Sequence, residues 1–192
     1  MRRLLLASSS PYRRELLSRL RLPFDCAAPD IDETAYPDEH PEHLVRRLAS
    51  EKAQALAGQY SDHLIIGSDQ VAVLGEKIIG KPKSFERARQ QLLNCSGKSI
   101  TFFTGLALLD SRDASAQVDC VPFTVHFREL DEARIERYLK LEQPYDCAGS
   151  FKAEGLGISL FRATEGDDVT SLIGLPMIRL VDMLLAKGIE IP

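Results

Sequence analysis

Apolar and polar residues follow two different periods along this chain. Two-residue alternation and short apolar runs are typical of strands, whereas apolar positions three and four residues apart are typical of helices. On this basis, strands are predicted at residues 3–7, 23–28, 64–74, 77–79, 99–109, 116–128 and 157–163. Helices are predicted at residues 10–20, 41–57, 84–94, 131–141 and 176–187. Residues 29–40 are rich in Pro, Asp and Glu, which predicts an irregular loop.

The order of these elements indicates the fold class. Helices interleaved with strands, some of which pair through short turns, predict an α/β or α+β chain on a mixed sheet. The 192 residues suit a single domain, or two intimate lobes, with a sizeable core. No repeat, low-complexity tract or long linker interrupts the chain.

Composition narrows the class of partner. The net charge of −4 argues against polymeric nucleic acid, because proteins that bind it usually carry a basic excess. No apolar run approaches the roughly 18 residues that span a bilayer, so we expect no membrane partner. The four cysteines form no CxxC pair, which favours reduced thiols in a cytoplasmic protein and argues against a zinc site.

The segment from Ser8 to Arg13 has the layout of an anion site. Ser10 suits a helix cap and Pro11 suits the first helical position, so free N–H groups should point at the loop that includes Ser8. Arg13 stands in the first turn, where the helix dipole disfavours a cation, and it shares an apolar stripe with three leucines. We therefore expect it to point inward towards an anion. The alternative is a capped helix with a snorkelling arginine.

Two lysines are candidates for phosphate contact. Lys52 replaces an apolar residue on the leucine stripe of the helix at 41–57. Lys81 precedes Pro82, which stiffens the backbone and suits a fixed cation. A phosphate in a cleft would satisfy both charges. Snorkelling at Lys52 and an ordinary turn lysine at Lys81 are the alternatives.

One carboxylate stands in an unusually apolar setting. Asp69 interrupts the strand at 64–74, where a carboxylate is costly unless it is paired or binds a metal. The alternative is a strand-end Asp whose carboxylate is satisfied by backbone N–H groups. Mg²⁺ is typically held by one or two carboxylates plus substrate phosphates, so Asp69 with Glu33 would suffice. Asp32 is the rival of Glu33, and spacing alone does not choose between them.

A glycine-rich stretch lies at residues 150–157. Its glycines allow close backbone approach, and Glu154 can face a ligand there. The stretch is not a dinucleotide fingerprint, because Leu160 occupies the place of the third glycine.

Taken together, these motifs resemble the Maf family of nucleotide pyrophosphatases over nearly the whole chain. The matching segments are Leu6-Ala7-Ser8-Ser9-Ser10-Pro11 with Arg13, Asp32-Glu33, Ala49-Ser50-Glu51-Lys52-Ala53, Gly67-Ser68-Asp69-Gln70, Gly80-Lys81-Pro82, Thr104-Gly105, Ala148-Gly149-Ser150-Phe151, Glu154-Gly155-Leu156-Gly157 and Gly174-Leu175-Pro176. The resemblance implies one Maf-like domain, residues 1–192, of two α/β lobes around a twisted mixed sheet with a deep central cleft, as in ITPases.

The resemblance also implies an activity and a set of roles. The reaction is hydrolysis of a nucleoside triphosphate between its α- and β-phosphates with a divalent cation (Mg, Mn or Co). Asp69 matches the family's proton acceptor and, with Glu33, its metal site. The positions that match phosphate contacts are Ser8, Ser10, Arg13, Lys52 and Lys81. A homodimer is left open.

Three positions distinguish branches of the family through the base pocket, and here they are Tyr12, Gln70 and Glu154. Relatives that act on dTTP and UTP typically carry Arg, Thr and Gln instead. The set in this chain resembles the branch that hydrolyses 7-methyl-GTP. A dTTP/UTP or broad non-standard-nucleotide pyrophosphatase is the alternative enzyme, and a non-catalytic nucleotide-binding regulator of division or cell shape is the alternative of another class.

Overall fold

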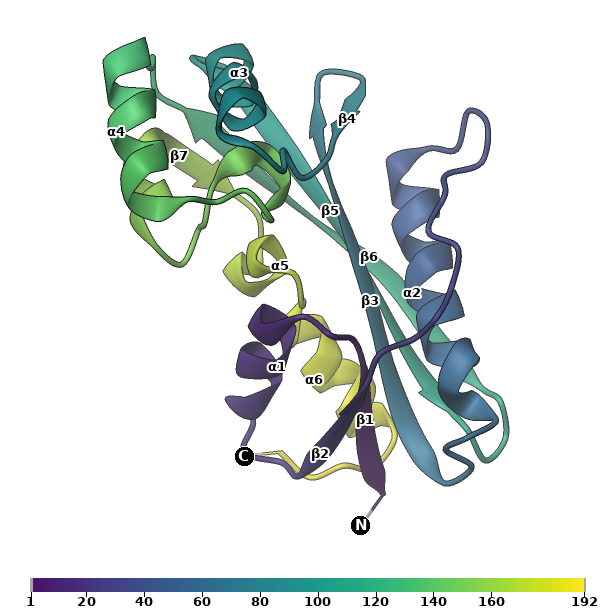
Figure 1. Cartoon of the computed structure of the whole chain (residues 1–192). Helices are drawn as coiled ribbons and strands as arrows, with labels where there is room; N and C mark the ends of the chain where they lie inside the picture. The colour runs from purple at the N-terminus through teal and green to yellow at the C-terminus, as the bar shows by residue number, and fades with distance from the viewer. Residues whose placement is uncertain (1, 192) are drawn as a thin grey trace. The chain divides into compact units, whose positions relative to one another are not determined.

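The computed structural model describes residues 2–191 and confirms a mixed α/β fold (Figure 1). The strands are β1 (Arg3–Ala7), β2 (Phe24–Ala27), β3 (His63–Leu74), β4 (Lys77–Ile79), β5 (Ser99–Asp110), β6 (Ala116–Phe127) and β7 (Phe161–Glu165). The helices are α1 (Pro11–Ser18), α2 (Pro41–Ala57), α3 (Phe85–Cys95), α4 (Glu132–Glu142), α5 (Val169–Ile173) and α6 (Met177–Ala186), with two 3-10 turns, η1 (Ala148–Ser150) and η2 (Leu156–Leu160).

The strands form a mixed sheet. Within residues 2–191 it has seven strands in the order β2-β1-β3-β5-β6-β7, and β4 pairs with β3. β1 runs parallel to both β2 and β3, whereas the β3–β4 and β6–β7 pairs are antiparallel. The turn from β5 to β6 is closed by the Asp110 N–H, which donates to the Ser115 carbonyl at 2.8 Å. The predicted mixed sheet is therefore confirmed.

The chain divides into two compact units. The first comprises residues up to Gln70, Phe103–Val121 and the chain from Asp168 on; the second comprises Val71–Phe102 and Pro122–Asp167. Strands β3, β5 and β6 each contribute residues to both units. None of the helices in the described part of the chain is long and apolar enough to cross a membrane.

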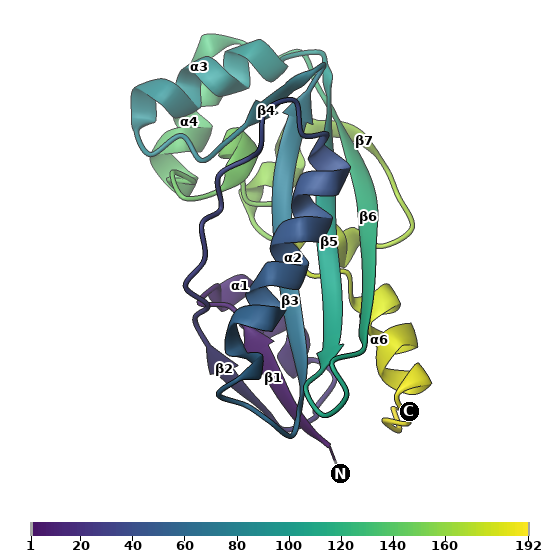
Figure 2. The same cartoon turned by 90° about the vertical axis from the view of Figure 1, so that its right-hand side faces the viewer.

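In the first unit, helices cover both faces of the sheet (Figures 1 and 2). Alternation along β1 sends Leu4 and Leu6 to one face and Leu5 and Ala7 to the other. The first pair joins a core with leucines of α1 and α6, and the second packs with Ala53 and Leu56 of α2. Both faces of β1 are buried, as expected for a strand between two parallel neighbours.

The second unit has a core of aromatic rings. Phe151 contacts Phe102, Phe127 and Phe161 edge-to-face, with ring centroids 5.4, 5.7 and 4.7 Å apart. Such edge-to-face contacts add to the stabilisation from buried area. They hold the segment that precedes the glycine-rich turn at 153–157.

Two predictions about local structure are wrong. Residues 157–160 are not a strand but lie in the 3-10 turn η2, and the strand β7 begins only at Phe161. The Gly155 and Gly157 N–H groups both donate to the Lys152 carbonyl, which coils the chain where an extended strand was expected. The short helix α5 was not predicted, because its five residues span little more than one helical turn and show no periodicity.

Candidate functional site

A buried lysine lies at the centre of the candidate site in the first unit. Lys52 is only 6% exposed, and its Nζ lies 2.6 Å from Asp69 Oδ1 and 2.7 Å from Glu33 Oε1. Asp69 is itself buried. The lysine therefore does not snorkel, and the Asp69 carboxylate is paired with a cation rather than capped by backbone N–H groups.

The close approach of α2 to β3 explains this pairing. A Cβ atom at Gly67 would lie 2.0 Å from the Ala49 carbonyl oxygen, so only glycine lets the helix backbone reach the strand. Lys52 lies one helical turn after Ala49, and Asp69 lies two residues after Gly67 on the same strand face. The sequence Gly67-Ser68-Asp69 thus places the carboxylate under the lysine.

The structure distinguishes Glu33 from Asp32. Glu33 contacts Lys52, although its side chain is 59% exposed. Asp32 Oδ1 instead accepts a hydrogen bond from the Thr34 N–H at 2.9 Å, which forms a local turn. Hydrogen bonds from the Thr34 side chain and then from its N–H lower the pKa of the Asp32 carboxyl. Of these two acids, only Glu33 is joined to Lys52 and through it to Asp69.

The loop between β1 and α1 has the capped geometry that the sequence predicts. Ser10 is the N-cap and its Oγ accepts from the Arg13 N–H at 3.4 Å, while Ser8 Oγ accepts from the Ser10 N–H at 3.1 Å. Pro11 begins the helix. Ser8 is buried and Ser10 half-buried. The positive end of the α1 dipole therefore lies at this loop.

Arg13 is half-buried and oriented by a carbonyl. Its Nε donates to the Gly174 carbonyl at 2.8 Å. Burial lowers the pKa of the guanidinium, and the negative charges of Asp69 and Glu33 act against that shift. Arg13 thus interacts electrostatically with the same two carboxylates as Lys52. Its inward orientation agrees with the prediction from its place on the apolar stripe of the helix.

A single short segment, Ser171–Gly174, holds several side chains of the site. The Gly174 carbonyl also accepts from Ser68 Oγ at 3.0 Å. The Ser171 carbonyl accepts from Thr104 Oγ1 at 2.9 Å and from Gln70 Nε2 at 2.7 Å. The amide nitrogen of Gln70 therefore points at this segment, because the flipped amide would place oxygen against oxygen.

The remaining candidates, Tyr12, Lys81 and Glu154, are half-buried or exposed. Tyr12 is half-buried in the first turn of α1. Lys81 and Glu154 belong to the second unit, where Lys81 is exposed after β4 and Glu154 is exposed in the turn before η2. Within that unit, the hydrogen bond from Lys83 is the main cause that lowers the pKa of the Asp146 carboxyl, and the charge of Lys81 adds a smaller contribution.

Sequence reasoning did not identify the supporting side chains as part of the site. Ser68, Thr104 and Ser171 are fully buried hydroxyls that donate to carbonyl oxygens. A run of hydroxyls next to Asp69 and Gln70 is a weak signal, because Ser and Thr are common in strands and turns. Only the fold shows that one carbonyl serves both Arg13 and Ser68.

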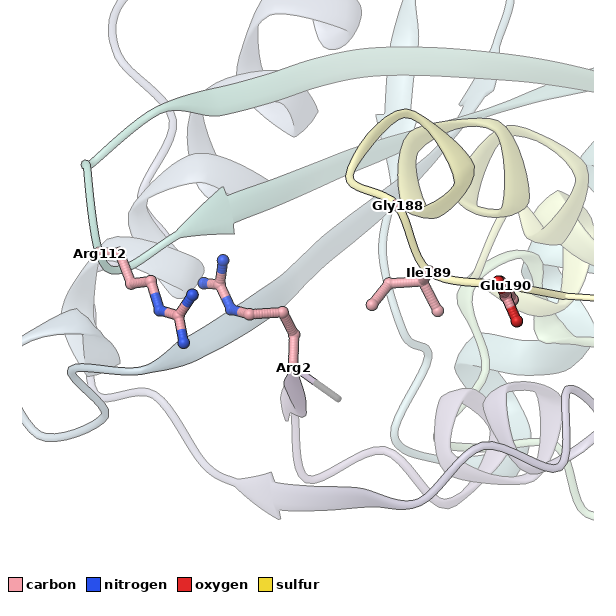
Figure 3. A pocket seen from close by; sticks show the side chains of 5 residues that line it. All are labelled: Arg2, Arg112, Gly188, Ile189 and Glu190. Atoms are coloured by element: carbon pink, nitrogen blue, oxygen red, sulfur yellow. The ribbon is translucent and has the colours of Figure 1, made fainter.

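Another pocket, of about 450 Å³, lies away from these residues in the first unit (Figure 3). Arg2 and Arg112 line it together with residues 188–190. Arg2 is paired with Asp110 through Nη1 at 2.9 Å, and Arg112 is paired with Asp62. Both cations have carboxylate partners, and none of the residues that line this pocket is a candidate site residue.

Two carboxylates of the site could serve as donors to a divalent cation. No group of three or more His, Cys, Asp or Glu side chains suited to a metal occurs among residues 2–191. Asp69 and Glu33, however, contact the same ammonium group and so lie close together. Two carboxylates fit an Mg²⁺-type ion whose other ligands are phosphates and water.

The fold and the site together define a class: a mixed α/β protein in which two carboxylates and the cations Lys52 and Arg13 lie beside the N-terminus of a helix. Within this class the chain belongs to the Maf-like protein family, which it matches over residues 3–187.

Relatives with high sequence identity cover almost the full length. The chain is 72% identical over 189 residues to a 7-methyl-GTP pyrophosphatase of Pseudomonas fluorescens, covering 98% of each chain. It is 69% identical to a protein of the same name from Pseudomonas aeruginosa, again over 98% of both chains.

Solved structures show the same fold at low sequence identity. The Staphylococcus aureus Ham1 protein is similar with a TM-score of 0.53 and 16% identity, over 97% of this chain and 100% of that chain. A HAM1 protein from Coxiella burnetii has the same TM-score and coverage at 14% identity.

Proposed function

We propose that this protein is a nucleoside triphosphate pyrophosphatase that hydrolyses 7-methyl-GTP to 7-methyl-GMP and diphosphate. The observation that carries the proposal is the buried Lys52 held between Asp69 and Glu33 beside Arg13. The names of the relatives at about 70% identity support the activity and the base.

Side chains of this protein would bind the triphosphate and supply a general base. Arg13, Lys52, Lys81 and the N-terminus of α1, with Ser8 and Ser10, would neutralise and orient the triphosphate. Asp69 would take a proton from water as its oxygen bonds to the α-phosphorus and the bond to the diphosphate breaks. With the triphosphate bound, Lys52 would exchange part of its contact with the carboxylates for phosphate oxygens.

Glu33 and Asp69 would hold a divalent cation, with Mg, Mn and Co as the candidates. When bound, such an ion supplies positive charge that stabilises the developing charge on the phosphate oxygens. The contact that both carboxylates make with Lys52 supports their assignment to one ion site.

Base recognition would fall to Tyr12, Gln70 and Glu154. The Gln70 amide nitrogen is engaged by Thr104 and Ser171, so this side chain offers its oxygen, an acceptor, to a ligand. Guanine presents donors on its pairing edge, N1–H and the exocyclic amine, which acceptors on Gln70 and Glu154 would match. Methylation at N7 makes the base cationic, which favours Glu154 and a stacked Tyr12.

A dTTP/UTP or broad nucleotide pyrophosphatase is the alternative within the class. A non-catalytic regulator is disfavoured by the complete set of acid, lysine and arginine side chains in the site. A cytoplasmic location, a monomer or homodimer, and the absence of nucleic-acid and membrane partners stay predictions from the sequence.

The experiment that tests the proposal is product analysis with purified protein and Asp69→Asn. The native protein should release diphosphate and the nucleoside monophosphate, not orthophosphate. Asp69→Asn should lose roughly 10²-fold or more in kcat, as expected when a general base is removed, while nucleotide binding is largely spared. If the Asn variant kept more than half of kcat, Asp69 would not be the base; absence of diphosphate from the native protein would favour the regulator.

A further inference from the structure

The loop that carries Glu33 is fixed to α2 by one arginine. This loop runs beside α2 before the chain enters the helix (Figures 1 and 2). Arg47 Nε and Nη2 each donate to the Glu39 carboxylate at 2.8 Å, and Nη2 also donates to the Thr34 carbonyl at 3.0 Å. The guanidinium carbon lies 4.0 Å from the centre of the Tyr36 ring. Three points of the loop therefore converge on one side chain.

The Arg47–Glu39 ion pair is largely buried and well oriented. The Arg47 and Glu39 side chains are 17% and 9% exposed, and the pair is bidentate, which is the strongest geometry for arginine and carboxylate. Hydrogen bonds from Arg47 lower the pKa of Glu39 to about 2. On the helix side, Arg47 Nη1 also donates to Glu51 at 3.1 Å, which orients the guanidinium.

The same contact determines where Glu33 lies. Thr34, whose carbonyl Arg47 binds, directly follows Glu33 in the chain. Glu33 is more than half exposed, so packing does not hold it against Lys52. Arg47 anchors the loop backbone directly on its C-terminal side, at the Thr34 carbonyl.

We propose that Arg47, through Glu39 and Thr34, is a positioning residue for Glu33 and so sets the affinity of the Asp69–Glu33 pair for a divalent cation. The inference rests on the proposed function for the identity of this ion site. Arg47 itself touches neither the ion nor the substrate; it orders the loop that brings the second carboxylate.

Arg46 provides a matched control. It is the neighbouring arginine on α2, and it pairs with Glu42 at 2.8 Å and Asp119 at 3.6 Å rather than with the loop. Arg46→Met removes the same charge from the same helix and leaves the loop contacts in place.

The test measures Mn²⁺ binding to the full chain without nucleotide, by electron paramagnetic resonance, for the native protein, Arg47→Met, Glu39→Gln and Arg46→Met. Arg47→Met and Glu39→Gln should weaken Mn²⁺ binding about 10-fold or more, as outer-shell substitutions do at metal sites. Arg46→Met should bind as the native protein does. In hydrogen exchange, amides of residues 33–39 should lose protection in the first two variants only.

Diphosphate release at saturating Mn²⁺ separates this inference from the proposed function. If Arg47 only positions Glu33, kcat of Arg47→Met should recover to within about twofold of the native value once Mn²⁺ is saturating. Equal Mn²⁺ affinity in Arg47→Met, in Glu39→Gln and in the native protein would overturn the inference, as would a native protein that binds no Mn²⁺. If Arg47→Met does not fold, Glu39→Gln decides. A native protein that binds Mn²⁺ but releases no diphosphate contradicts the proposed function alone.

Discussion

At the scale of single residues, Lys52 is the buried cation at the centre of the candidate site. It is buried on the apolar stripe of α2, where an unpaired ammonium would be costly, and two carboxylates neutralise it. Removing one partner of a buried ion pair leaves the other charge without compensation. A loss of function in a Lys52 variant must therefore be separated from a loss of stability.

Lys52→Ala should reduce both stability and kcat/KM, whereas Lys81→Ala should reduce kcat/KM alone. Lys52→Ala leaves Asp69 buried without its cation, which costs on the order of 3 kcal/mol. Lys81 is exposed, so its loss should remove only a phosphate contact, worth about 1.5–3 kcal/mol in transition-state stabilisation.

Thermal melts recorded beside Michaelis curves check this pair of predictions. An unchanged melting temperature in Lys52→Ala would show that the pairing with Asp69 does not stabilise the fold. Unchanged kinetics in Lys81→Ala would remove Lys81 from the phosphate site.

At the scale of elements, the segment Ser171–Gly174 connects the last part of the chain to the site. Gly174 has φ +120° and caps α5, a conformation that L side chains rarely adopt. In this conformation its carbonyl accepts hydrogen bonds from both Arg13 Nε and Ser68 Oγ. The buried Asp168 carboxylate fixes the segment by accepting from the Thr170 and Ile178 N–H groups at 2.8 and 2.9 Å.

Gly174→Ala should lower kcat/KM about 10-fold or more, because strain at this φ would move the carbonyl that orients Arg13. Its stability should fall by about 1–2 kcal/mol. Steady-state kinetics with a denaturation curve measure both, and Gly188→Ala is the control, since Gly188 also has positive φ but contacts none of these residues. Native kinetics in Gly174→Ala would show that this carbonyl does not position Arg13.

The sequence predicted the elements well and the site in part. The bounds of α2 and the cap at Ser10 follow from local rules and are confirmed. The supporting contacts of the site could not be predicted, because Thr104, Ser171 and Gln70 are far apart in sequence and meet only through the sheet order. Likewise, spacing could not show that Glu33 rather than Asp32 contacts Lys52, since that contact depends on the conformation of the loop.

At the scale of the whole molecule, the beginning and the end of the described chain meet at one carboxylate. Asp110, at the end of β5, accepts from Arg2 before β1 and from Lys187 after α6, at 2.9 and 3.4 Å. The Asp110 side chain is 6% exposed, and the hydrogen bonds from Arg2 hold its pKa well below the usual range. This cluster stabilises the first unit without touching the candidate site.

Asp110→Asn should lower the free energy of unfolding by about 3 kcal/mol at neutral pH and leave turnover unchanged. A carboxyl whose pKa is lowered by folding stabilises the protein above its unfolded pKa of about 4 and loses that contribution as the pH falls towards the folded value. Urea unfolding at several pH values should therefore show a shallower loss of stability below pH 4 in the variant than in the native protein. Parallel curves would show that Asp110 does not titrate in this way.

The proposed reaction is hydrolysis of 7-methyl-GTP at the α–β linkage, with acceptors on Gln70 and Glu154 that would bind the donors on the guanine edge. The most direct test is kcat/KM on 7-methyl-GTP, GTP, dTTP and UTP for the native protein and for Glu154→Gln. We expect 7-methyl-GTP to be preferred over GTP by about tenfold, because the cationic base adds about 0.5–2 kcal/mol of cation–π attraction and a charge-assisted pair. Glu154→Gln should shift preference away from 7-methyl-GTP. Equal kcat/KM on 7-methyl-GTP and UTP, or no shift in the Gln variant, would contradict the account.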